Sequence, residues 1–267
     1  MTTSLQEPSG ASVEFAQEGG VARITLNRPD RMNALDREAW GLLHSAISEV
    51  KSNPDIRVVV LRGAGANFCA GADVRAASQR TEHPLQRMRT ISDVVRDLFE
   101  LPVPTIAAVD GVAVGAGWNL ALACDFLIAT DRARFSQIFA RRGLSADCGG
   151  SWLLPRIVGM QKAKRLLYLA EMLSASEAYA LGLVLKVCAA EAFADEVESL
   201  VGKLVVAPPA AISQDKELIN ATWGMSFSEQ LLRENAAQAV NFATDGPIAR
   251  RAIASGEQPV FEGKWQL

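Results

Sequence analysis

Asp147 is the residue whose type and setting most suggest chemistry. It lies in the segment 145–152 (SADCGGSW), where its neighbours are small or apolar. A carboxylate in a poorly hydrated loop has a raised pKa and can both take and return a proton near neutral pH. An aspartate beside two glycines also suits an ordinary turn. The segment by itself is therefore compatible with both roles.

Two loops rich in glycine and alanine precede Asp147. One covers residues 69–73 (CAGAD) and the other residues 115–117 (GAG). The second opens a predicted helix, and the N–H groups of a first helical turn have no partner within the helix. The two loops therefore predict paired backbone donors for an anion. The small residues at 115–117 are equally compatible with a close helix–sheet crossing.

Other polar residues give weaker signals. Arg28 lies in a proline-containing loop between a strand and a helix, where it either forms the turn or contacts an anionic ligand. His44 and His83 have no neighbouring serine or cysteine in a triad pattern, which favours structural or solvent-facing roles. The four cysteines show no C-x-x-C spacing. We interpret them as reduced packing residues rather than zinc ligands.

The elements that must position these loops alternate between strand and helix patterns. Runs rich in β-branched residues predict strands at 21–26, 58–62, 105–109, 125–129 and 184–187. Apolar residues at helical spacing predict helices after Asp36 and from Pro84 to about Leu101, and Ser174 with Glu177 predicts a capping box for another. A short helix is expected from Gly117 to near Cys124. This alternation favours an α/β fold with a parallel sheet covered by helices.

The composition limits the class of protein. The chain has 267 residues, 49% of them hydrophobic, and a formal net charge of −3. Such a balance argues against a protein that binds nucleic acid or a polybasic membrane site. No apolar stretch approaches the roughly 20 residues that a membrane helix needs. We expect a cytoplasmic protein with a mobile tail at residues 1–11, a core at 12–204 and a helical region at 205–267.

Taken together, the motifs resemble those of the crotonase superfamily, the enoyl-CoA hydratase/isomerase family. Residues 24–29 (ITLNRP) and 33–35 (NAL) are similar to the opening signature, and residues 68–73 (FCAGAD) to the first oxyanion loop. Residues 104–111 (PTIAAVDG), 115–117 and 124–125 are similar to the second. The similarity extends from about residue 13 to residue 264. It implies a crotonase-like spiral of β-β-α turns with a helical C-terminal trimerisation region.

The resemblance also implies roles for individual residues. In such enzymes, backbone N–H groups matching Ala70 and Ala116 hold the thioester oxygen, which gains charge as the thioester becomes an enolate. The resemblance predicts a substrate-binding set at Arg28, Ala70, Gly71, Ala72, Asp73, Ala116, Asn119, Phe139, Phe261 and Lys264. Coenzyme A is part of the expected substrate, and no further cofactor and no metal are implied.

The departures from the family pattern are informative. Hydratases of this family carry two glutamates that activate water, and these would fall at Asn119 and Phe139. Neither side chain exchanges a proton near neutral pH. Asp147 occupies the position where several double-bond isomerases of the superfamily place an acid/base carboxylate. Residues 147–156 (DCGGSWLLPR) particularly resemble the ring-epoxide and enoyl isomerases of phenylacetate degradation. A related dehalogenase group uses an aspartate in this region as a nucleophile, so the position alone does not fix the chemistry.

We therefore expect an acyl-CoA isomerase that moves a double bond through a thioester enolate, with Asp147 as acid and base. The alternatives are an enoyl-CoA hydratase with atypical residues and a non-catalytic acyl-CoA-binding protein. Trp118, Phe139 and Trp152 are expected either to form an apolar wall of the site or simply to pack in the core. The sequence does not indicate which acyl group is bound.

The last residues carry a separate expectation. Residues 259–264 (PVFEGK) resemble the family's C-terminal segment, in which an aromatic and a lysine approach the nucleotide of bound coenzyme A. Phe261 would offer a flat face to adenine and Lys264 a cation to phosphate. An ordinary solvated terminus is the other interpretation. The resemblance implies a homotrimer or a hexamer, and no nucleic-acid or membrane partner.

Overall fold

The centre of the protein is a six-stranded sheet in the order β1-β2-β3-β4-β6-β9. The structure, a computed structural model, describes residues 10–75 and 82–266. The strands are β1 (Val13–Glu18), β2 (Val21–Leu26), β3 (Val58–Gly63), β4 (Thr105–Val109), β6 (Phe126–Thr130) and β9 (Lys186–Cys188). β1 is antiparallel to β2, and the other pairs of this sheet are parallel. The predicted parallel sheet is thus confirmed.

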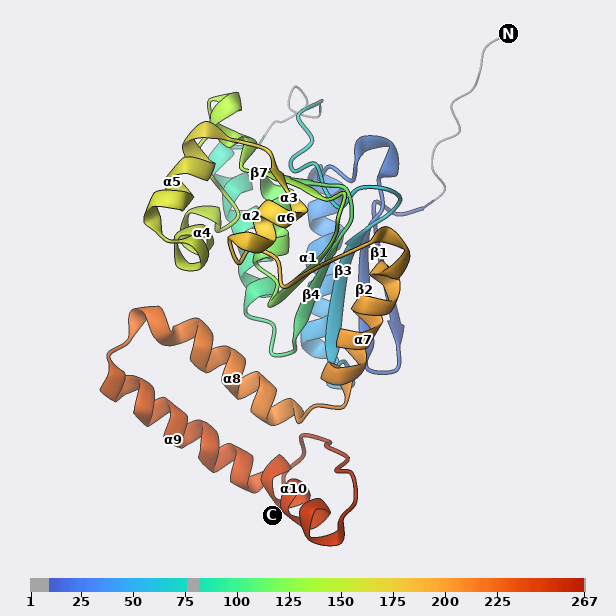
Figure 1. Cartoon of the computed structure of the whole chain (residues 1–267), viewed down its shortest axis with the longest axis vertical. Coiled ribbons are helices and arrows are strands. Elements are labelled where there is room, and N and C mark those ends of the chain that lie inside the picture. Colours follow the sequence, from blue (N-terminus) through green and yellow to red (C-terminus); the bar gives the residue numbers. More distant parts are fainter. Residues whose placement is uncertain (1–9, 76–81, 267) are drawn as a thin grey trace.

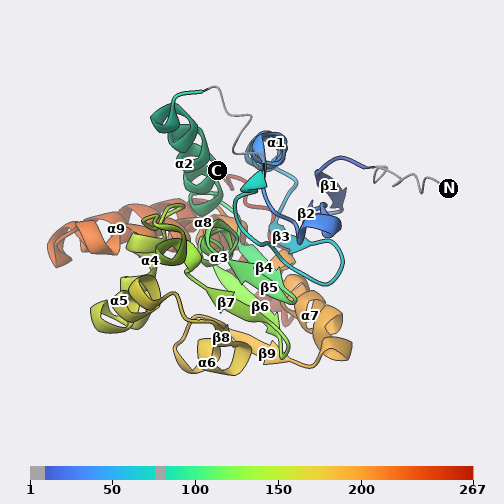
Figure 2. The ribbon, with the colours of Figure 1, turned by 90° about the horizontal axis from the view of Figure 1, so that it is seen from above.

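The two faces of the sheet pack against different helices because alternate residues of a strand point to opposite sides. Val59 and Leu61 of β3 belong to the main core with helices α1 (Arg37–Ser52) and α2 (Pro84–Phe99). Val58 and Val60 belong to a second cluster with α7 (Phe193–Val205). Figure 2 shows α1 and α2 on one side of the sheet and α7 on the other. Burial on both faces explains the continuous apolar run from Val58 to Leu61 in β3.

A smaller sheet lies beside the first. Its strands are β5 (Val112–Val114), β7 (Arg134–Ser136) and β8 (Leu173–Ser174), in that order. The helices of this part of the chain are α3 (Ala116–Leu122), α4 (Gly150–Val158), α5 (Met160–Leu169) and α6 (Ala175–Ala180). Short 3-10 helices lie at Pro29–Arg31, Ile138–Arg142 and Ala190–Ala192. All residues of α3 are buried. This helix therefore provides a fixed internal support for the loops around it.

Three helices form the C-terminal region. They are α8 (Pro209–Ala221), α9 (Phe227–Ala243) and α10 (Asp245–Ser255), and a 3-10 turn at Thr222–Gly224 joins the first two. Figure 1 shows α8 and α9 running antiparallel beside the core. Lys216 of α8 ties this region to the core by donating to the carbonyl of Val103 at 3.0 Å and to the carboxylate of Asp125 at 2.8 Å.

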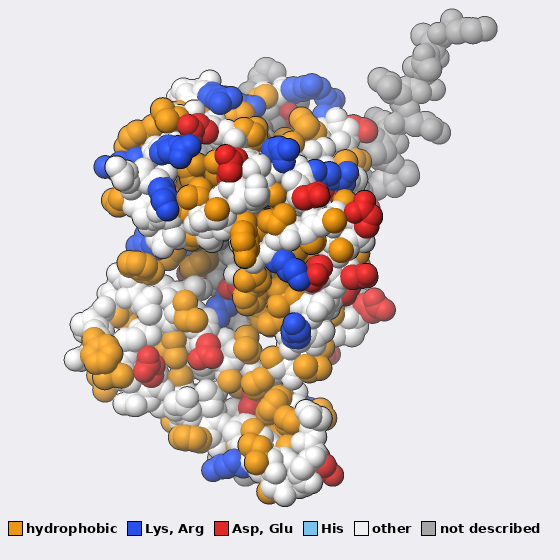
Figure 3. All heavy atoms as spheres, viewed as in Figure 1, with side chains coloured by type: hydrophobic (Ala, Val, Ile, Leu, Met, Phe, Trp, Pro, Cys, Tyr) orange, Lys and Arg blue, Asp and Glu red, His pale blue; other side chains and the backbone are white. Residues whose placement is uncertain are grey.

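The C-terminal region exposes large apolar side chains. Phe227 is 78% exposed, Ile253 81% and Trp265 63%. Figure 3 shows hydrophobic side chains spread over this part of the surface. Apolar residues scattered singly are normal on a protein surface, whereas a group of large ones favours contact with another surface.

Most predicted elements are found within a few residues of their expected bounds. The helix predicted to Leu101 ends at Phe99, where the Glu100 N–H caps the Arg96 carbonyl at 2.9 Å. Strands β1, β5, β7 and β8 and helix α4 were not predicted. The capping box of Ser174 and Glu177 is present. Residues 1–9 of the expected tail lie outside the described residues. Among the described helices, none is both long and apolar enough to cross a membrane.

Candidate active site

Asp147 lies in a tight turn that leads into α4. Cys148 and Gly149 both have left-handed backbone conformations, with φ angles of 48° and 79°. The N–H of Gly150, the first residue of α4, donates to the Asp147 carbonyl at 3.0 Å. A left-handed conformation costs little at glycine but is strained at cysteine. The turn therefore holds Asp147 in a defined direction that a relaxed chain would not favour.

The Asp147 carboxyl group is poorly hydrated. Desolvation by burial raises its pKa above the ordinary aspartate value, and the adjacent Cys148 thiol opposes this rise. Its Oδ1 atom is buried and has no hydrogen-bond partner among the described residues. A buried acceptor without a partner costs free energy in the empty protein. The atom is thus available to a proton that a ligand would bring.

A chain of two buried amides fixes the backbone of Asp147. The Asn119 side chain in α3 donates to the Asp147 carbonyl at 2.8 Å, and it accepts from the Gln137 Nε2 atom at 2.8 Å. Asn119 and Gln137 are both fully buried. Asn119 therefore supports the turn. This role differs from the substrate contact predicted for Asn119.

The same helix begins at the second glycine-rich loop. Ala116 is the first residue of α3, and its N–H has no hydrogen-bond partner among the described residues. A Cβ placed on Gly71 would lie only 3.4 Å from the Ala116 nitrogen and 2.8 Å from the Val114 carbonyl oxygen. The two loops predicted from the sequence are therefore in contact, and they approach closely because Gly71 has no side chain.

The free donor of the first loop differs from the predicted one. The Ala70 N–H donates to the Met32 carbonyl at 2.9 Å, so it is already engaged within the chain, and this geometry does not support its predicted contact with a thioester oxygen. Ala72 forms a parallel β-bridge with Leu35. In this bridge the Leu35 N–H donates to the Gly71 carbonyl, and the Leu35 carbonyl accepts from the Asp73 N–H. The Ala72 N–H has no hydrogen-bond partner among the described residues. Ala72 and Ala116 thus offer the open donors.

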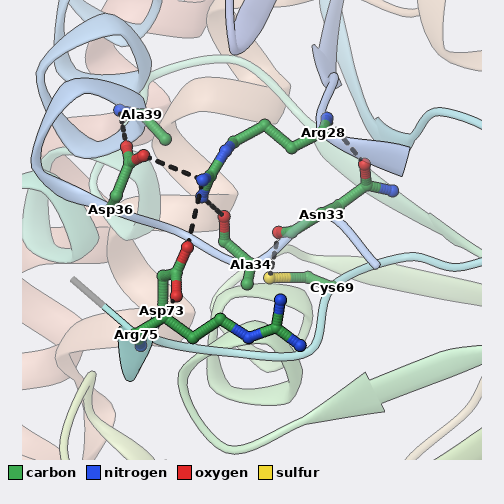
Figure 4. A network of polar contacts seen from close by, with 8 residues as sticks. All are labelled: Arg28, Asn33, Ala34, Asp36, Ala39, Cys69, Asp73 and Arg75. Carbon is green, nitrogen blue, oxygen red and sulfur yellow. Dashed lines mark hydrogen bonds and ion pairs between the residues drawn. The ribbon is translucent and has the colours of Figure 1, made fainter. Parts of the chain in front are cut away.

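Arg28 is committed to the protein itself. Its guanidinium pairs with Asp73 at 3.0 Å and Asp36 at 3.1 Å, and it donates to the Ala34 carbonyl at 2.5 Å. Figure 4 shows these groups converging on the guanidinium from three directions. The predicted contacts of Arg28 and the Asp73 side chain with an anionic ligand are therefore not supported. Their ion pair connects the loop after β2 to the loop at 69–73.

An apolar cavity of about 390 Å³ adjoins the Asp147 turn. Cys148 and Gly149 form part of its wall, and Phe99 of α2 and Trp152 of α4 form another part. Phe139 is buried, and its ring would lie 3.7 Å from a Cβ at Gly115. Trp118 is fully buried in the core. Of the three aromatics predicted as an apolar wall, Trp152 alone lines this cavity.

The predicted nucleotide contacts lie elsewhere in the chain. The Phe261 carbonyl accepts from Arg57 at 3.1 Å, and the Lys264 side chain is 75% exposed and pairs with Glu262 at 3.0 Å. Figure 1 shows the end of the chain beside α10, away from α4. Within one chain, Phe261 and Lys264 are therefore not brought together with Asp147.

Comparison with known proteins identifies the family. The model of the enoyl-CoA hydratase/isomerase family matches residues 16–252. The chain belongs to the enoyl-CoA hydratase/isomerase family. It is 35% identical to the 1,2-epoxyphenylacetyl-CoA isomerase of Escherichia coli K12, over 92% of this chain and 97% of that protein. It is 33% identical to the short-chain-enoyl-CoA hydratase of Clostridium acetobutylicum, over 88% of this chain and 90% of that protein.

The solved structures agree with this membership. The enoyl-CoA hydratase of Bacillus anthracis is 29% identical and superposes with a TM-score of 0.90, covering 95% of this chain and 100% of that one. The fold expected from the resemblance is thus confirmed. Relatives named as isomerases and relatives named as hydratases are both similar to this chain. The family membership therefore identifies an acyl-CoA enzyme but does not identify its reaction.

The sequence analysis missed several residues of the site. Gln137 carries no local signal, because its importance depends on burial and on Asn119, which lies 18 residues away. Phe99 was not assigned to the site, although it ends a predicted amphipathic helix. The alternation of small residues at 69–73 also gave no sign of which N–H group remains open.

Proposed function

We propose that this protein is an enoyl-CoA isomerase that moves a double bond between the β,γ and α,β positions of an acyl-CoA thioester. The Asp147 carboxylate removes a proton from the carbon beside the thioester. The electron pair of that C–H bond moves into a dienolate, whose negative charge develops on the thioester oxygen. The protonated Asp147 then returns the proton to the γ carbon, and the double bond becomes conjugated.

The observation that carries this proposal is the state of the Asp147 carboxyl group. Its buried Oδ1 has no partner, and burial raises its pKa toward the range in which one group both accepts and donates a proton. The turn and Asn119 fix its backbone. A single positioned carboxyl group suits a reaction in which the same proton leaves one carbon and enters another.

The N–H groups of Ala72 and Ala116 are proposed to hold the thioester oxygen. They are the open donors of two loops that touch at Gly71. Fixed donors stabilise the dienolate more than the neutral thioester, and one such donor is worth about 3–4 kcal/mol in comparable sites. This proposal replaces Ala70 with Ala72 and keeps Ala116.

Hydration with Asp147 as the only acid and base is the second candidate, because relatives named as hydratases are similar to this chain. Asn119 and Phe139 offer no carboxylate, and both are buried. A hydratase would have to position water with Asp147 alone. We therefore expect slow conversion of a 2-enoyl-CoA into its 3-hydroxy product.

We also propose that the protein works as a trimer or as stacked trimers. The large apolar side chains exposed on α9 and α10 support this, because such residues favour contact with another surface. In that assembly Phe261 and Lys264 would reach the nucleotide of a coenzyme A bound to another subunit. The end of the chain lies beside α10 and away from α4, which fits this arrangement.

The decisive experiment is Asp147→Asn, which keeps the shape of the side chain and removes its base. Turnover of a 3-enoyl-CoA should fall about 10²–10⁴-fold, and the affinity for a saturated thioester should change little. In the wild type, kcat/KM should fall on acidification around a pKa above that of an ordinary aspartate, because the base must be ionised. Near-full activity of the variant would overturn the proposal.

A further inference from the structure

We infer that the cavity beside Asp147 takes an acyl group that carries a flat aryl ring. This inference rests on the proposed function, since Cys148 and Gly149, the two residues that follow the proposed acid/base residue, line the cavity. It names the class of substrate, which the family membership leaves open.

The wall of the cavity contains an aromatic pair in a defined geometry. The rings of Phe99 and Trp152 have centroids 5.6 Å apart and lie at 79° to each other, which is an edge-to-face arrangement. Both line the cavity. A third aromatic ring can join such a pair by offering its positive edge to one face or its face to one edge. A saturated chain has no quadrupole and gains only the burial of its apolar area.

The Trp152 ring is held in place although it is 38% exposed. The Arg156 guanidinium lies 3.7 Å from its centroid, and the Arg156 Nη1 atom donates to the Trp152 carbonyl at 2.8 Å. The same guanidinium lies 5.3 Å from the ring of Trp223, which follows α8. Stacked cations of this kind stabilise the ring orientation. The cavity therefore presents a preformed aromatic wall rather than a loose side chain.

The remaining wall suits a compact apolar group. Val95 and Leu153 contribute aliphatic surface, and Ala123 and Gly149 contribute almost none. Arg96 is the charged residue of the described lining, and it pairs with Asp93 at 2.9 Å. An apolar cavity of about 150 Å³ is known to hold benzene. The 390 Å³ here therefore accommodates one ring with a short linker to the thioester.

Rigidity favours a ring over a chain of equal carbon number. A linear acyl chain loses the freedom of several rotatable bonds when it is confined, whereas an aryl group is already rigid. The aromatic wall and this smaller entropic loss act in the same direction. An aryl ring should also bind better than a saturated ring, because a puckered cyclohexane cannot make the edge-to-face contact.

Three thioesters with eight acyl carbons and no isolated carbon–carbon double bond test this: phenylacetyl-CoA, cyclohexylacetyl-CoA and octanoyl-CoA. None has a double bond to shift, so titration calorimetry on the wild-type protein measures binding without turnover. Phenylacetyl-CoA should bind about tenfold more tightly than each of the other two, which corresponds to about 1.4 kcal/mol. Equal or tighter binding of octanoyl-CoA or cyclohexylacetyl-CoA would overturn the inference.

Variants of the wall provide the second arm. Trp152→Leu should reduce the preference for phenylacetyl-CoA to less than threefold, while Trp152→Phe should largely keep it. The matched control is Tyr168→Leu on α5, a 68% exposed aromatic residue outside the described lining of the cavity. It should leave the preference intact. A preference that survives in Trp152→Leu would also overturn the inference, because the wall would then not be its source.

These outcomes are separable from those of the proposed function. If Asp147→Asn remains fully active but the binding preference is found, the isomerase proposal fails and the cavity assignment stands. If Asp147→Asn is inactive and the preference is absent, the chemistry stands and the substrate class is wrong.

Discussion

Gly150→Ala offers a sharp test of how the active-site turn is supported. A Cβ at this position would lie 2.4 Å from the Asn119 Nδ2 atom, and 2.7 Å from its Oδ1. Ordinary contact begins at 3.4 Å, so the two groups must separate by 3.4 − 2.4 = 1.0 Å. Asn119 cannot simply rotate away, because it is fully buried and both ends of its amide are hydrogen-bonded. The turn that carries Asp147 must therefore move.

The displacement gives the expected magnitude. Misplacing a reacting group by about 1 Å costs about 10²-fold in rate, and overpacking costs about 1–3 kcal/mol of stability. We expect kcat for a 3-enoyl-CoA to fall about 10²-fold, with a lower midpoint of thermal unfolding. The backbone itself is not the cause, because Gly150 is not among the glycines with a positive φ angle.

Two controls isolate the steric effect. Gly202→Ala in α7 adds the same methyl group where nothing lies within 4 Å, and it should leave kcat unchanged and raise stability by about 0.5–1 kcal/mol. Asn119→Ala combined with Gly150→Ala should show a coupling energy, because the single changes act on one contact. Wild-type kcat and stability in Gly150→Ala would refute the claim that Asn119 fixes this turn.

Four further predictions concern single groups. Asp147→Asn should raise the free energy of unfolding more at pH 8 than at pH 4, because folding raises the pKa of the carboxyl group. The wild-type penalty therefore grows as pH rises above the pKa of the unfolded chain and is complete above the folded pKa, and denaturant titrations at both pH values will show it. Replacing Ala72 by lactic acid, which exchanges its N–H for an ester oxygen, should lower kcat about 10²–10³-fold. The same exchange at Ala70 should mainly lower stability, by about 0.5–1.5 kcal/mol, because that N–H bonds within the protein; steady-state kinetics and thermal unfolding separate the two cases. Arg28→Met should lower the free energy of unfolding in urea by about 1–3 kcal/mol, since it removes the cation shared by two carboxylates. Lys264→Ala should raise KM about fivefold for CoA thioesters but not for pantetheine thioesters, and an equal rise for both would exclude a contact with the nucleotide.

The long elements of the fold are well predicted from the sequence. β2 and β4 have the expected bounds, because runs rich in β-branched residues between turn residues are typical of strands. β5 and β7 have three residues each, too few for a periodic pattern to emerge. Helix α4 was missed because it begins at Gly150 and contains Pro155, both of which indicate a helix break.

The candidate site is predicted only in part, for a related reason. Asp147 and the two glycine-rich loops are local patterns, and the sequence shows them directly. The Asp73 partner of Arg28 lies 45 residues away, so the sequence around Arg28 leaves both turn formation and ligand contact open. The choice between Ala70 and Ala72 depends on how Met32 and Leu35 pair with the loop, which only the folded register determines.

The hydrogen bond from Asn119 to the Asp147 carbonyl also bears on how such sites diverge. A glutamate in place of Asn119 would place a carboxylate next to the Asp147 carbonyl, which now accepts a hydrogen bond from Asn119. The same carboxylate would also lie beside the acidic side chain of Asp147. Like charges in a dry site raise each other's pKa, so neither acid would keep its usual ionisation. Replacing Asp147 first would leave the site without an acid. Positions 119 and 147 are thus epistatic, and a lineage exchanging one chemistry for the other passes through an impaired intermediate unless both change together.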